Sequence, residues 1–578
     1  AFLTYLEVYI RKVFGSRHCS TIVLALCSHA ATGYPVTQPK FLPSNFLRLI
    51  LSPVSFTTMV SSAWLLALLS SSSQAYGIRA RGPTYEAHPD KAAAVKSAFD
   101  RAWSGYYKYA FPNDSLKPIA KSFQNDRNGW GASAIDALST AIVMEDAVVI
   151  GQIVDYIPTI NFDKSSNSGD TISLFETTIR YLGGLLSAHD MLSGLPSGKY
   201  GINSTQLDAI LDQATHLADN LKVGFDTPSG VPINDLLFQP PRTTNTSTNG
   251  LATIGTLVLE WTRLSDKTGK TEYAELSQKA ESYLLNPKPA SGEPWPGLLG
   301  TNVDVNNGNF VDSSGGWNGG TDSYYEYLIK MYLYDTKRFA SYKDSWVKAA
   351  DSSIKYLASH PSTRPDMTFL AAYDAKDKLS YVSTHLACFD GGNFILGGLT
   401  LDRPDYVQFG IDLAYSCHET YTATVTGIGP EVFAWQDGNA SDTSNNPAAP
   451  AEQAEFYKQA GFWITNSNYI LRPEVIESWY YAYRATGDSK YQDWAWTAFQ
   501  AINATCSVGV GFSEVTNVNA PAGGSFTDFQ DSFWFAEVLK YLYMIQAEEA
   551  PWQVSAVHDN QYVFNTEAHP FKVAGTPV

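Results

Sequence analysis

From about residue 90 the chain reads as helix after helix, and a weak internal repeat among these helices limits the fold more than any other feature. Residues 257–273 and 478–491 follow one plan: an apolar helix with a Trp, then Thr-Gly and a polar residue, then a second helix near a Tyr. The Gly accepts the left-handed conformation that ends a helix, and Thr, Asp or Ser caps the next helix. Residues 332–337 hold a degenerate third copy. The pattern is typical of repeated helical hairpins.

An open solenoid and a closed ring of helices both fit this repeat. Long insertions rich in Gly, Asn and Ser at 301–320 and 437–452 favour a closed enzyme barrel that carries its loops on one face. Strand-like alternation is scarce and confined to short stretches such as 427–435. No linker divides the body. We therefore predict an all-α protein in which residues 90–578 form one catalytic domain.

The composition allows a large core and excludes some partners. Hydrophobic residues make up 44% of the 578 residues and charged residues 17%, so the chain is not predominantly disordered. The aromatic content of 13% is explained mainly by a large core, with stacking on sugar rings as the second explanation. The net charge of −17 argues against nucleic acid or an anionic membrane as the partner.

The N-terminal region contains a short leader-like segment. Within residues 59–77 a brief apolar run is followed by small residues, which is typical of a signal peptide, and the run is short for a bilayer span. We expect residues 1–58 to be upstream sequence that a gene-model error has joined to the protein. A signal-anchor that holds the protein in a Golgi membrane is the alternative.

Sequons and cysteines agree with passage through the secretory pathway. The chain has five Asn-X-Ser/Thr sequons, which begin at Asn113, Asn203, Asn245, Asn439 and Asn503. Cys19 and Cys27 lie in the doubtful N-terminal region, which leaves three cysteines in the body. An odd number in an oxidising compartment predicts one disulfide and one free thiol.

Carboxylates stand at the starts of several aromatic helices that are far apart in the sequence. Each has an ordinary explanation. Glu176 lies four residues before Arg180, where an ion pair contributes roughly a few tenths of a kcal/mol. Asp322 follows a Gly-rich loop and suits a helix cap, while Glu474 follows a Pro and complements the helix dipole. Glu431 ends a turn that contains Gly and Pro.

These explanations leave the apolar, aromatic surroundings of the acids unexplained. A carboxyl among aromatic rings has a raised pKa and can act as a general acid. A carboxylate beside a helix N-terminus and an Arg stays ionised and can activate water. A cavity ringed by both kinds could split a glycosidic bond.

The C-terminal segment 564–570 is unusual for the end of a chain. Its sequence, Phe-Asn-Thr-Glu-Ala-His-Pro, could belong to a disordered tail. Alternatively, the segment is threaded back into the body and offers the oxygens of Thr566 to a hard cation such as calcium.

Eight short segments occur in one order across nearly the whole body: 135–138, 175–188, 240–242, 322–327, 385–389, 471–478, 537–542 and 564–570. In content and order they resemble the class I α-1,2-mannosidases (glycoside hydrolase family 47), most closely the fungal secreted branch. The resemblance implies an inverting, calcium-dependent hydrolase with an (α/α)7 barrel. A C-terminal hairpin would plug one end of the barrel and place Thr566 at the cavity floor, where it would bind Ca²⁺ together with waters. The resemblance also implies a disulfide between Cys388 and Cys417.

Residue by residue, the resemblance implies roles for the acids. Glu176 would be the general acid, acting through a water, and Glu474 the favoured general base, with Asp322 as the competing base. Further acids would complete the catalytic site, line the sugar subsite or surround the calcium: Glu431, Glu477, Glu537 and Glu567. Four other side chains would shape the pocket: Arg180, His385, Arg472 and Phe533.

One departure from the family pattern bears on specificity. Endoplasmic-reticulum members carry an Arg two residues before the Asp matched by Asp322, and this chain has Gly320 there. We predict that it trims all α-1,2-linked mannoses, from Man9 toward Man5, from high-mannose N-glycans on glycoproteins. We expect a monomer that is secreted or held in the Golgi.

Three alternatives to this hydrolase make different predictions. A catalytically weak, mannosidase-like glycan-binding factor of glycoprotein quality control would not need both acids. A barrel hydrolase acting on plant or bacterial polysaccharide would lack the Thr566 segment. A helical scaffold without enzymatic activity would have open-ended repeats.

Overall fold

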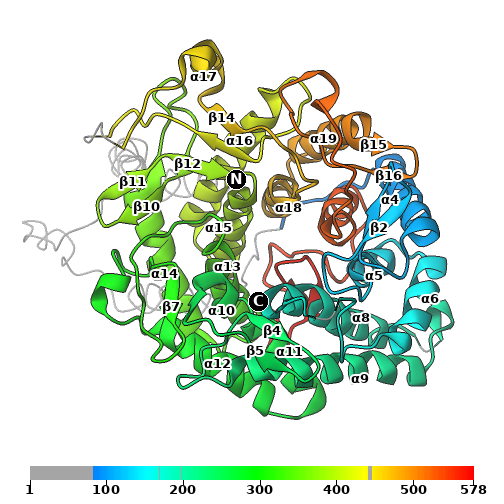
Figure 1. Ribbon diagram of the computed structural model, residues 1–578. Coiled ribbons are helices and arrows are strands. Elements are labelled where there is room, and N and C mark those ends of the chain that lie inside the picture. Colours follow the sequence, from blue (N-terminus) through cyan, green and yellow to red (C-terminus); the bar gives the residue numbers. More distant parts are fainter. Residues whose placement is uncertain (1–81, 168, 197, 441–444) are drawn as a thin grey trace, which may run out of the picture. The chain divides into compact units, whose positions relative to one another are not determined.

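Among the residues that the structure describes, seven inner helices form a closed ring (Figure 1). They are α5 (Ala132–Val143), α8 (Gly183–Ser193), α11 (Val258–Thr268), α13 (Asp322–Tyr334), α15 (Phe389–Thr400), α18 (Glu474–Thr486) and α20 (Leu539–Met544). Each contacts the next, and α20, with the π-helical segment η11 (Trp534–Val538) before it, contacts α5 and closes the ring. The predicted (α/α)7 barrel is confirmed.

An outer helix packs against each inner helix. The outer helices are α4 (Pro89–Tyr109), α6 (Ala147–Tyr156), α9 (Ser204–Leu221), α12 (Glu272–Leu285), α14 (Ala340–Ser352), α16 (Pro404–Thr422) and α19 (Lys490–Cys506). The first of them, α4, packs on the last inner helix, α20, whereas the others follow their inner partners in the sequence. The Thr-Gly repeat marks two inner-to-outer turns: Gly269 and Gly487 are left-handed, and their N–H groups cap α11 and α18.

The two layers differ in burial as their sequences require. Every residue of α5 is buried, because an inner helix has neighbours on all sides. In α9 only one stripe is buried: Ile210, Ala214, Leu217, Ala218 and Leu221. Each buried Leu or Ile of such a stripe stabilises the fold by roughly 1.5–3 kcal/mol.

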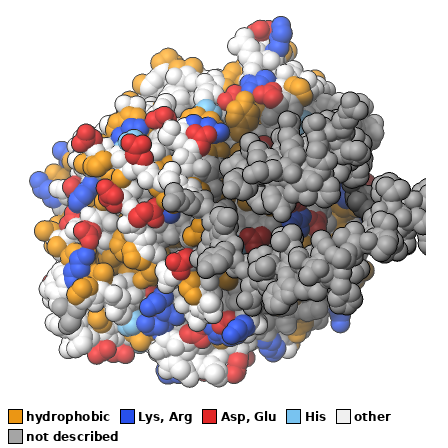
Figure 2. Space-filling model, turned by 180° about the vertical axis from the view of Figure 1, so that it is seen from behind, with side chains coloured by type: hydrophobic (Ala, Val, Ile, Leu, Met, Phe, Trp, Pro, Cys, Tyr) orange, Lys and Arg blue, Asp and Glu red, His pale blue; other side chains and the backbone are white. Residues whose placement is uncertain are grey.

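The structure is a computed structural model that describes residues 82–578, except 168, 197 and 441–444. The predicted upstream segment 1–58, the leader 59–77, Cys19 and Cys27 lie outside the described residues. Residues 82–578 cluster as one unit. In the part of the chain that is described, no helix combines the length and the hydropathy that a membrane span requires. On the face seen in Figure 2, acidic and basic side chains are interspersed.

The strands are short, and all their pairings are antiparallel. Two sheets have three strands, in the orders β3-β4-β5 and β12-β13-β14, and the rest are two-stranded. The strands are β1 (Ser115–Lys117), β2 (Ser122–Gln124), β3 (Ile172–Ser173), β4 (Asp235–Leu237), β5 (Arg242–Thr243), β6 (Thr248–Gly250), β7 (Asn302–Asp304), β8 (Ala358–Ser359), β9 (Phe369–Leu370), β10 (Ala372–Ala375), β11 (Lys378–Ser380), β12 (Val382–Thr384), β13 (Val432–Ala434), β14 (Trp463–Asn466), β15 (Ser507–Val508), β16 (Gly511–Phe512), β17 (Tyr562–Phe564) and β18 (Pro570–Lys572).

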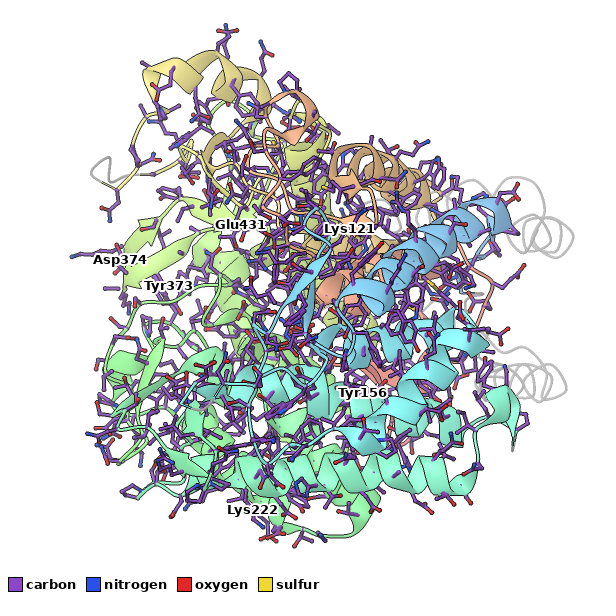
Figure 3. All side chains as sticks on the ribbon, turned by 45° about the vertical axis from the view of Figure 1, so that its right-hand side comes forward. Lys121, Tyr156, Lys222, Tyr373, Asp374 and Glu431 are labelled. Atoms are coloured by element: carbon purple, nitrogen blue, oxygen red, sulfur yellow. A yellow bond between two sulfur atoms is a disulfide. The ribbon has the colours of Figure 1, made fainter. Side chains whose placement is uncertain are left out.

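Strand β10 shows how these strands pack on the barrel. Tyr373 is buried, and its hydroxyl donates to the carbonyl oxygen of Leu299 at 2.7 Å. The next residue, Asp374, is exposed (Figure 3). This is the alternation expected of a strand with one solvated face.

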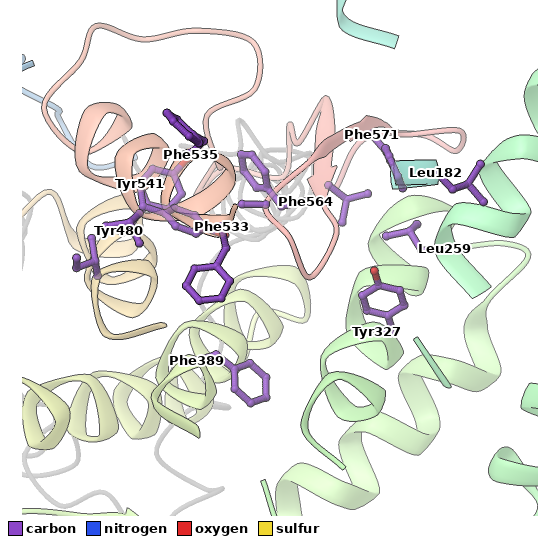
Figure 4. Close-up of a cluster of buried hydrophobic side chains, with 14 of the residues drawn as sticks. Leu182, Leu259, Tyr327, Phe389, Tyr480, Phe533, Phe535, Tyr541, Phe564 and Phe571 are labelled. Carbon is purple, nitrogen blue, oxygen red and sulfur yellow. The ribbon is translucent and has the colours of Figure 1, made fainter. Parts of the chain in front are cut away.

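The C-terminal hairpin β17–β18 lies inside the ring. Phe564 and Phe571 pack among side chains of the inner helices (Figure 4). At the turn, the Asn565 amide donates to the Ile179 carbonyl oxygen and to Glu260 Oε1, at 2.9 and 2.8 Å. The hairpin therefore closes one end of the barrel as predicted, and it is not a disordered tail.

Candidate active site

A cavity of about 350 Å³ enters the ring at the N-terminal ends of several inner helices. Eleven of the residues singled out in the sequence line it: Glu176, Arg180, Gly320, Asp322, Arg472, Glu474, Glu477, Phe533, Glu537, Thr566 and Glu567. His385 and Glu431 do not line it and lie behind Glu474 and Arg472, to which they bond. Side chains more than 300 residues apart in the sequence thus meet in one space.

Glu176 stands on the short helix α7 (Leu174–Thr177), whose N-cap Ser173 accepts from the Glu176 N–H at 3.1 Å. Its carboxylate accepts from Arg180 Nε at 2.9 Å and lies 3.6 Å from Arg127 Nε. Burial opposes the negative charge, but the two guanidinium groups outweigh it and lower the pKa of Glu176. Glu176 is therefore ionised in the free cavity.

Arg180 connects the wall of the cavity to its floor. It lies in the π-helical segment η3 (Thr178–Leu182), and such segments are frequent at functional sites. While its Nε binds Glu176, its Nη1 donates to Glu567 at 2.9 Å and to Ser532 at 3.2 Å. One buried guanidinium thus fixes a wall carboxylate and the hairpin turn together.

Glu474 is the first residue of α18. Its Oε2 lies 2.9 Å from His385 Nδ1, and its Oε1 lies 3.5 Å from Arg472 Nη1. Burial raises the pKa, but the His385 hydrogen bond and the Arg472 charge outweigh burial and lower the pKa of Glu474. Glu431 in turn holds Arg472 with hydrogen bonds of 2.7 to 2.8 Å.

The backbone beside Arg472 is strained. Leu471 has a φ of 65°, in the left-handed region that a branched side chain rarely adopts. Such a conformation costs about 1–3 kcal/mol and persists where the surrounding structure enforces it, often at functional sites. Here it directs Arg472 and Glu474 to the same cavity.

Asp322 is in the opposite charge state. It begins α13, and its Oδ1 accepts from the Ser323 N–H at 2.8 Å. Burial, together with the charges of Glu326 and Glu474, raises the pKa of Asp322 to about 7. Of Glu176, Glu474 and Asp322, the first two are therefore ionised, and the third is protonated below about pH 7.

The floor near Thr566 is rich in acids. Burial and neighbouring carboxylates raise the pKa of Glu477 to about 8, and they raise that of Glu537 well above its ordinary value. Lys330 pairs with Glu326, and Arg180 with Glu567. Acids outnumber cations, so the floor suits a divalent cation.

Thr566 offers oxygen ligands for such an ion. Its N–H donates to the Tyr327 hydroxyl at 3.2 Å. Within the described residues, its hydroxyl and carbonyl oxygens make no hydrogen bond. Among those same residues, no three His, Cys, Asp or Glu side chains form a cluster that could ligate a metal directly. The donor set therefore fits an oxygen-seeking ion that contacts Thr566 and reaches the floor acids through water.

Apolar side chains form the remaining wall. Phe175, Leu386, Phe389, Ile470 and Phe533 line the cavity. The Arg180 guanidinium lies 5.7 Å from the centre of the Phe533 ring. Aromatic faces beside oriented carboxylates are suited to a ring that has an apolar face and several hydroxyls.

Among the lining residues that sequence reasoning did not single out are Arg127, Glu326, Phe389 and Asp531. Glu326 was detectable, because it lies four residues after Asp322 and so shares its helix face. Phe389 directly follows one of the matched Cys residues. Arg127 and Asp531 lie in irregular loops, where no periodicity indicates the direction of a side chain.

The cysteines follow the expected pattern. A disulfide joins Cys388, at the start of α15, to Cys417 on α16. Cys506 is buried with a free thiol. Because the disulfide ties the His385 segment to an outer helix, it supports the wall behind Glu474.

Comparisons with known proteins agree along nearly the whole described chain. The family model of Glycosyl hydrolase family 47 matches residues 98–573. A probable mannosyl-oligosaccharide alpha-1,2-mannosidase 1B of Aspergillus clavatus is 58% identical over 488 residues, which are 84% of this chain and 93% of that protein. The mannosyl-oligosaccharide alpha-1,2-mannosidase 1B of Aspergillus phoenicis is 56% identical over 84% of this chain and 92% of its own. The solved structure of an alpha-1,2-mannosidase from Trichoderma reesei superposes with a TM-score of 0.82 at 54% identity, over 84% of this chain and all of that one.

Proposed function

The chain belongs to glycosyl hydrolase family 47, and from that premise we propose that it hydrolyses terminal α-1,2-linked mannose of high-mannose N-glycans with inversion of the anomeric carbon. The observation that carries the proposal is the cavity in which Glu176, Asp322 and Glu474 meet beside Thr566. A glycan-binding factor would need the apolar wall and the hydroxyl partners but not carboxyls in two charge states.

Glu474 is suited to be the general base. It is ionised, it stands at a helix N-terminus, and His385 fixes its orientation. In an inverting reaction the base takes a proton from a water that attacks the anomeric carbon, on the side away from the leaving group. Arg472 and His385 keep the carboxylate charged until that water is bound.

Two carboxyls are candidates for the general acid. Glu176 matches the family pattern, but it is ionised in the free cavity, so a proton must reach it through water. Asp322 already holds a proton below about pH 7. If Asp322 is the acid, kcat falls as pH rises through about 7, and Asp322→Asn loses about 10²- to 10⁴-fold in kcat together with this alkaline limb. If Glu176 is the acid, the limb survives in Asp322→Asn.

Calcium is the metal that the family implies, and the donor set at the hairpin turn fits it. The hydroxyl and carbonyl oxygens of Thr566 would bind the ion, and waters would connect it to Glu477, Glu537 and Glu567. When bound, the ion would supply open coordination positions for two hydroxyls of the terminal mannose.

Gly320 supports broad trimming. It lines the cavity with a φ of 94°, and a Cβ there would meet only Thr301 Cγ2, at 3.7 Å. No side chain at this position narrows the space for an oligosaccharide branch. We expect Man9 to be shortened toward Man5. Gly320→Arg should favour one product, while Gly320→Ala controls for the strained backbone.

A labelled Man9GlcNAc2 digest tests the whole proposal. We expect mannose release that EDTA abolishes and calcium restores, with β-mannose as the first anomer seen by proton NMR. Glu474→Gln should lower kcat by about 10²- to 10⁴-fold, as expected for the loss of general base catalysis. Release of α-mannose, or a digest that stops at a single Man8 isomer, would contradict the inverting mechanism or the broad trimming, respectively.

We also propose that the protein acts in the secretory pathway as a secreted monomer, with retention in the Golgi as the alternative. The sequons and the disulfide support an oxidising, glycosylating compartment. Fractionation of the producing cells, with sedimentation of the purified protein, tests both statements.

A further inference from the structure

A second cavity lies on the outer layer, in a groove between α4 and α19. Its volume is about 620 Å³, within the range of small-ligand sites. These two helices are the first and last of the outer layer, and they contact each other where the ring closes (Figure 1). None of the residues that line this groove lines the candidate active site.

Aromatic rings and small residues shape the groove. On α19, the rings of Trp496 and Phe499 stack with their centres 5.4 Å apart at 30°. On α4, Ala94 and Ala98 line the groove with short side chains. Phe499 is 5% exposed and supports Trp496 from behind, while Lys91 Nζ lies over the Trp496 ring, 5.9 Å from its centre. An aromatic platform beside a few polar groups suits the apolar face of a sugar ring.

One end of the groove carries one of the five sequons. Asn503 begins Asn-Ala-Thr near the end of α19, and its side chain is exposed. Its Oδ1 accepts from Arg101 Nη2 at 3.0 Å. Arg101 is itself held by Ser507 Oγ at 2.5 Å, and its guanidinium lies 4.4 Å from the Phe512 ring centre. The amide is therefore oriented, and its Nδ2 makes no hydrogen bond to the described residues.

The sequon at Asn113 differs in its amide nitrogen. The Asn113 Nδ2 donates to the Ala110 carbonyl oxygen at 2.8 Å, and its Oδ1 accepts from Asn125 at 3.1 Å. The hydroxyl residues that complete the two sequons, Ser115 and Thr505, are both buried. A glycan on Asn113 would break packed contacts, whereas a glycan on Asn503 would leave the bond to Arg101 intact.

We propose that Asn503 carries an N-linked glycan whose first sugars lie in the α4–α19 groove, against Trp496. The modification forms a bond between Asn503 Nδ2 and the anomeric carbon of an N-acetylglucosamine. That carbon loses its bond to the pyrophosphate of a lipid-linked donor, and the amide nitrogen loses one proton. The attached glycan covers the seam at which the ring of helices closes.

Mass spectrometry of the full chain, produced in a fungal host, tests the modification. After trimming to one sugar, the Asn503 peptide should carry a single N-acetylglucosamine, and Thr505→Ala should abolish it while Thr505→Ser retains it. An unmodified Asn503 in the wild-type protein would overturn the proposal. This readout does not depend on mannosidase activity.

Release by a peptide N-glycosidase from the native protein tests the position of the glycan. We expect release from Asn503 to be about tenfold slower than in Trp496→Ala, which corresponds to about 1.4 kcal/mol of contact with the ring. Heat-denatured samples of both proteins should release it equally fast. Equal rates from the two native proteins would show a glycan that extends into solvent, and the groove assignment would be wrong.

Discussion

The substitution Glu431→Gln tests whether Glu431 only holds Arg472 in position or takes part in the reaction itself. Glu431 does not line the cavity, and both of its carboxylate oxygens accept from Arg472. Gln keeps one acceptor but loses the charge and the second acceptor. A charge-assisted hydrogen bond contributes about 1.5–3 kcal/mol. At about 1.4 kcal/mol for each factor of ten, kcat/KM should fall by about 10- to 150-fold.

The pH dependence of kcat/KM is a second, independent test of Glu431→Gln. Arg472 helps to lower the pKa of Glu474, and a general base works only when it is deprotonated. If Arg472 is no longer held by Glu431, the pKa of Glu474 rises. On acidification, Glu474 is then protonated, and inactive as a base, at a higher pH than in the wild-type protein. The acid limb of kcat/KM should therefore move to higher pH in Glu431→Gln.

Glu419→Gln is a matched control. Glu419 also binds a guanidinium, that of Arg364 at 3.0 Å, and its side chain is 18% exposed against 15% for Glu431. Glu419 does not line the cavity, so kcat/KM should be unchanged. The reasoning is refuted if Glu431→Gln is as inactive as Glu474→Gln with an unshifted pH profile, because Glu431 would then act on the substrate itself.

Three further predictions concern the metal, pH and the hairpin. Calcium at 100 times its Kd should stabilise the wild-type protein by about 2.7 kcal/mol but should not stabilise Thr566→Val, as measured by thermal unfolding with and without EDTA. The pKa of Asp322 rises from 3.8 in the unfolded chain to about 7 in the fold. Its contribution to stability is therefore complete below about pH 3.8 and is lost as the pH rises through about 7. In EDTA, the Tm of Asp322→Asn relative to wild type should therefore increase between about pH 4 and pH 8. Phe571→Ala should cost about 3–5 kcal/mol in urea unfolding because Phe571 is fully buried, whereas Phe526→Ala, at a residue 42% exposed, should change stability by no more than about 0.5 kcal/mol.

The helical hairpins were predictable from the sequence because their signals are local. Gly269 and Gly487 adopt the left-handed conformation at the ends of inner helices. This conformation is required by the local turn, so the Gly is a signal that can be read from the neighbouring residues. Closure of the ring was not predictable from composition or periodicity, since it depends on α5 packing against α20 across about 400 residues. The long loop insertions only favoured a closed barrel, and the family resemblance gave the (α/α)7 architecture.

The sequence predicted which acids lie in the site better than it predicted their protonation states. Aromatic surroundings suggested a raised pKa for a carboxyl near Phe175, yet Glu176 is held ionised by Arg180 and by Arg127, which comes from a distant loop. Asp322, at the end of a Gly-rich loop, has a pKa raised to about 7 instead. A sequence can show which carboxyls stand at helix starts, but the sign of a pKa shift depends on which cations reach them in space.

The buried polar contacts of the hairpin turn explain why the end of this chain cannot be dispensable. Asn565 binds Ile179 and Glu260, Glu567 binds Arg180, and the carbonyl oxygen of Ala568 accepts from the buried Lys540. Each contact gives a buried polar group of the barrel a further partner, and a typical hydrogen bond of this kind contributes about 0.5–1.5 kcal/mol. The same contacts fix the two free oxygens of Thr566 in the cavity. Removal of the hairpin would therefore destabilise the ring and dismantle the floor of the site in one step, which is why stability and activity should fail together in hairpin variants.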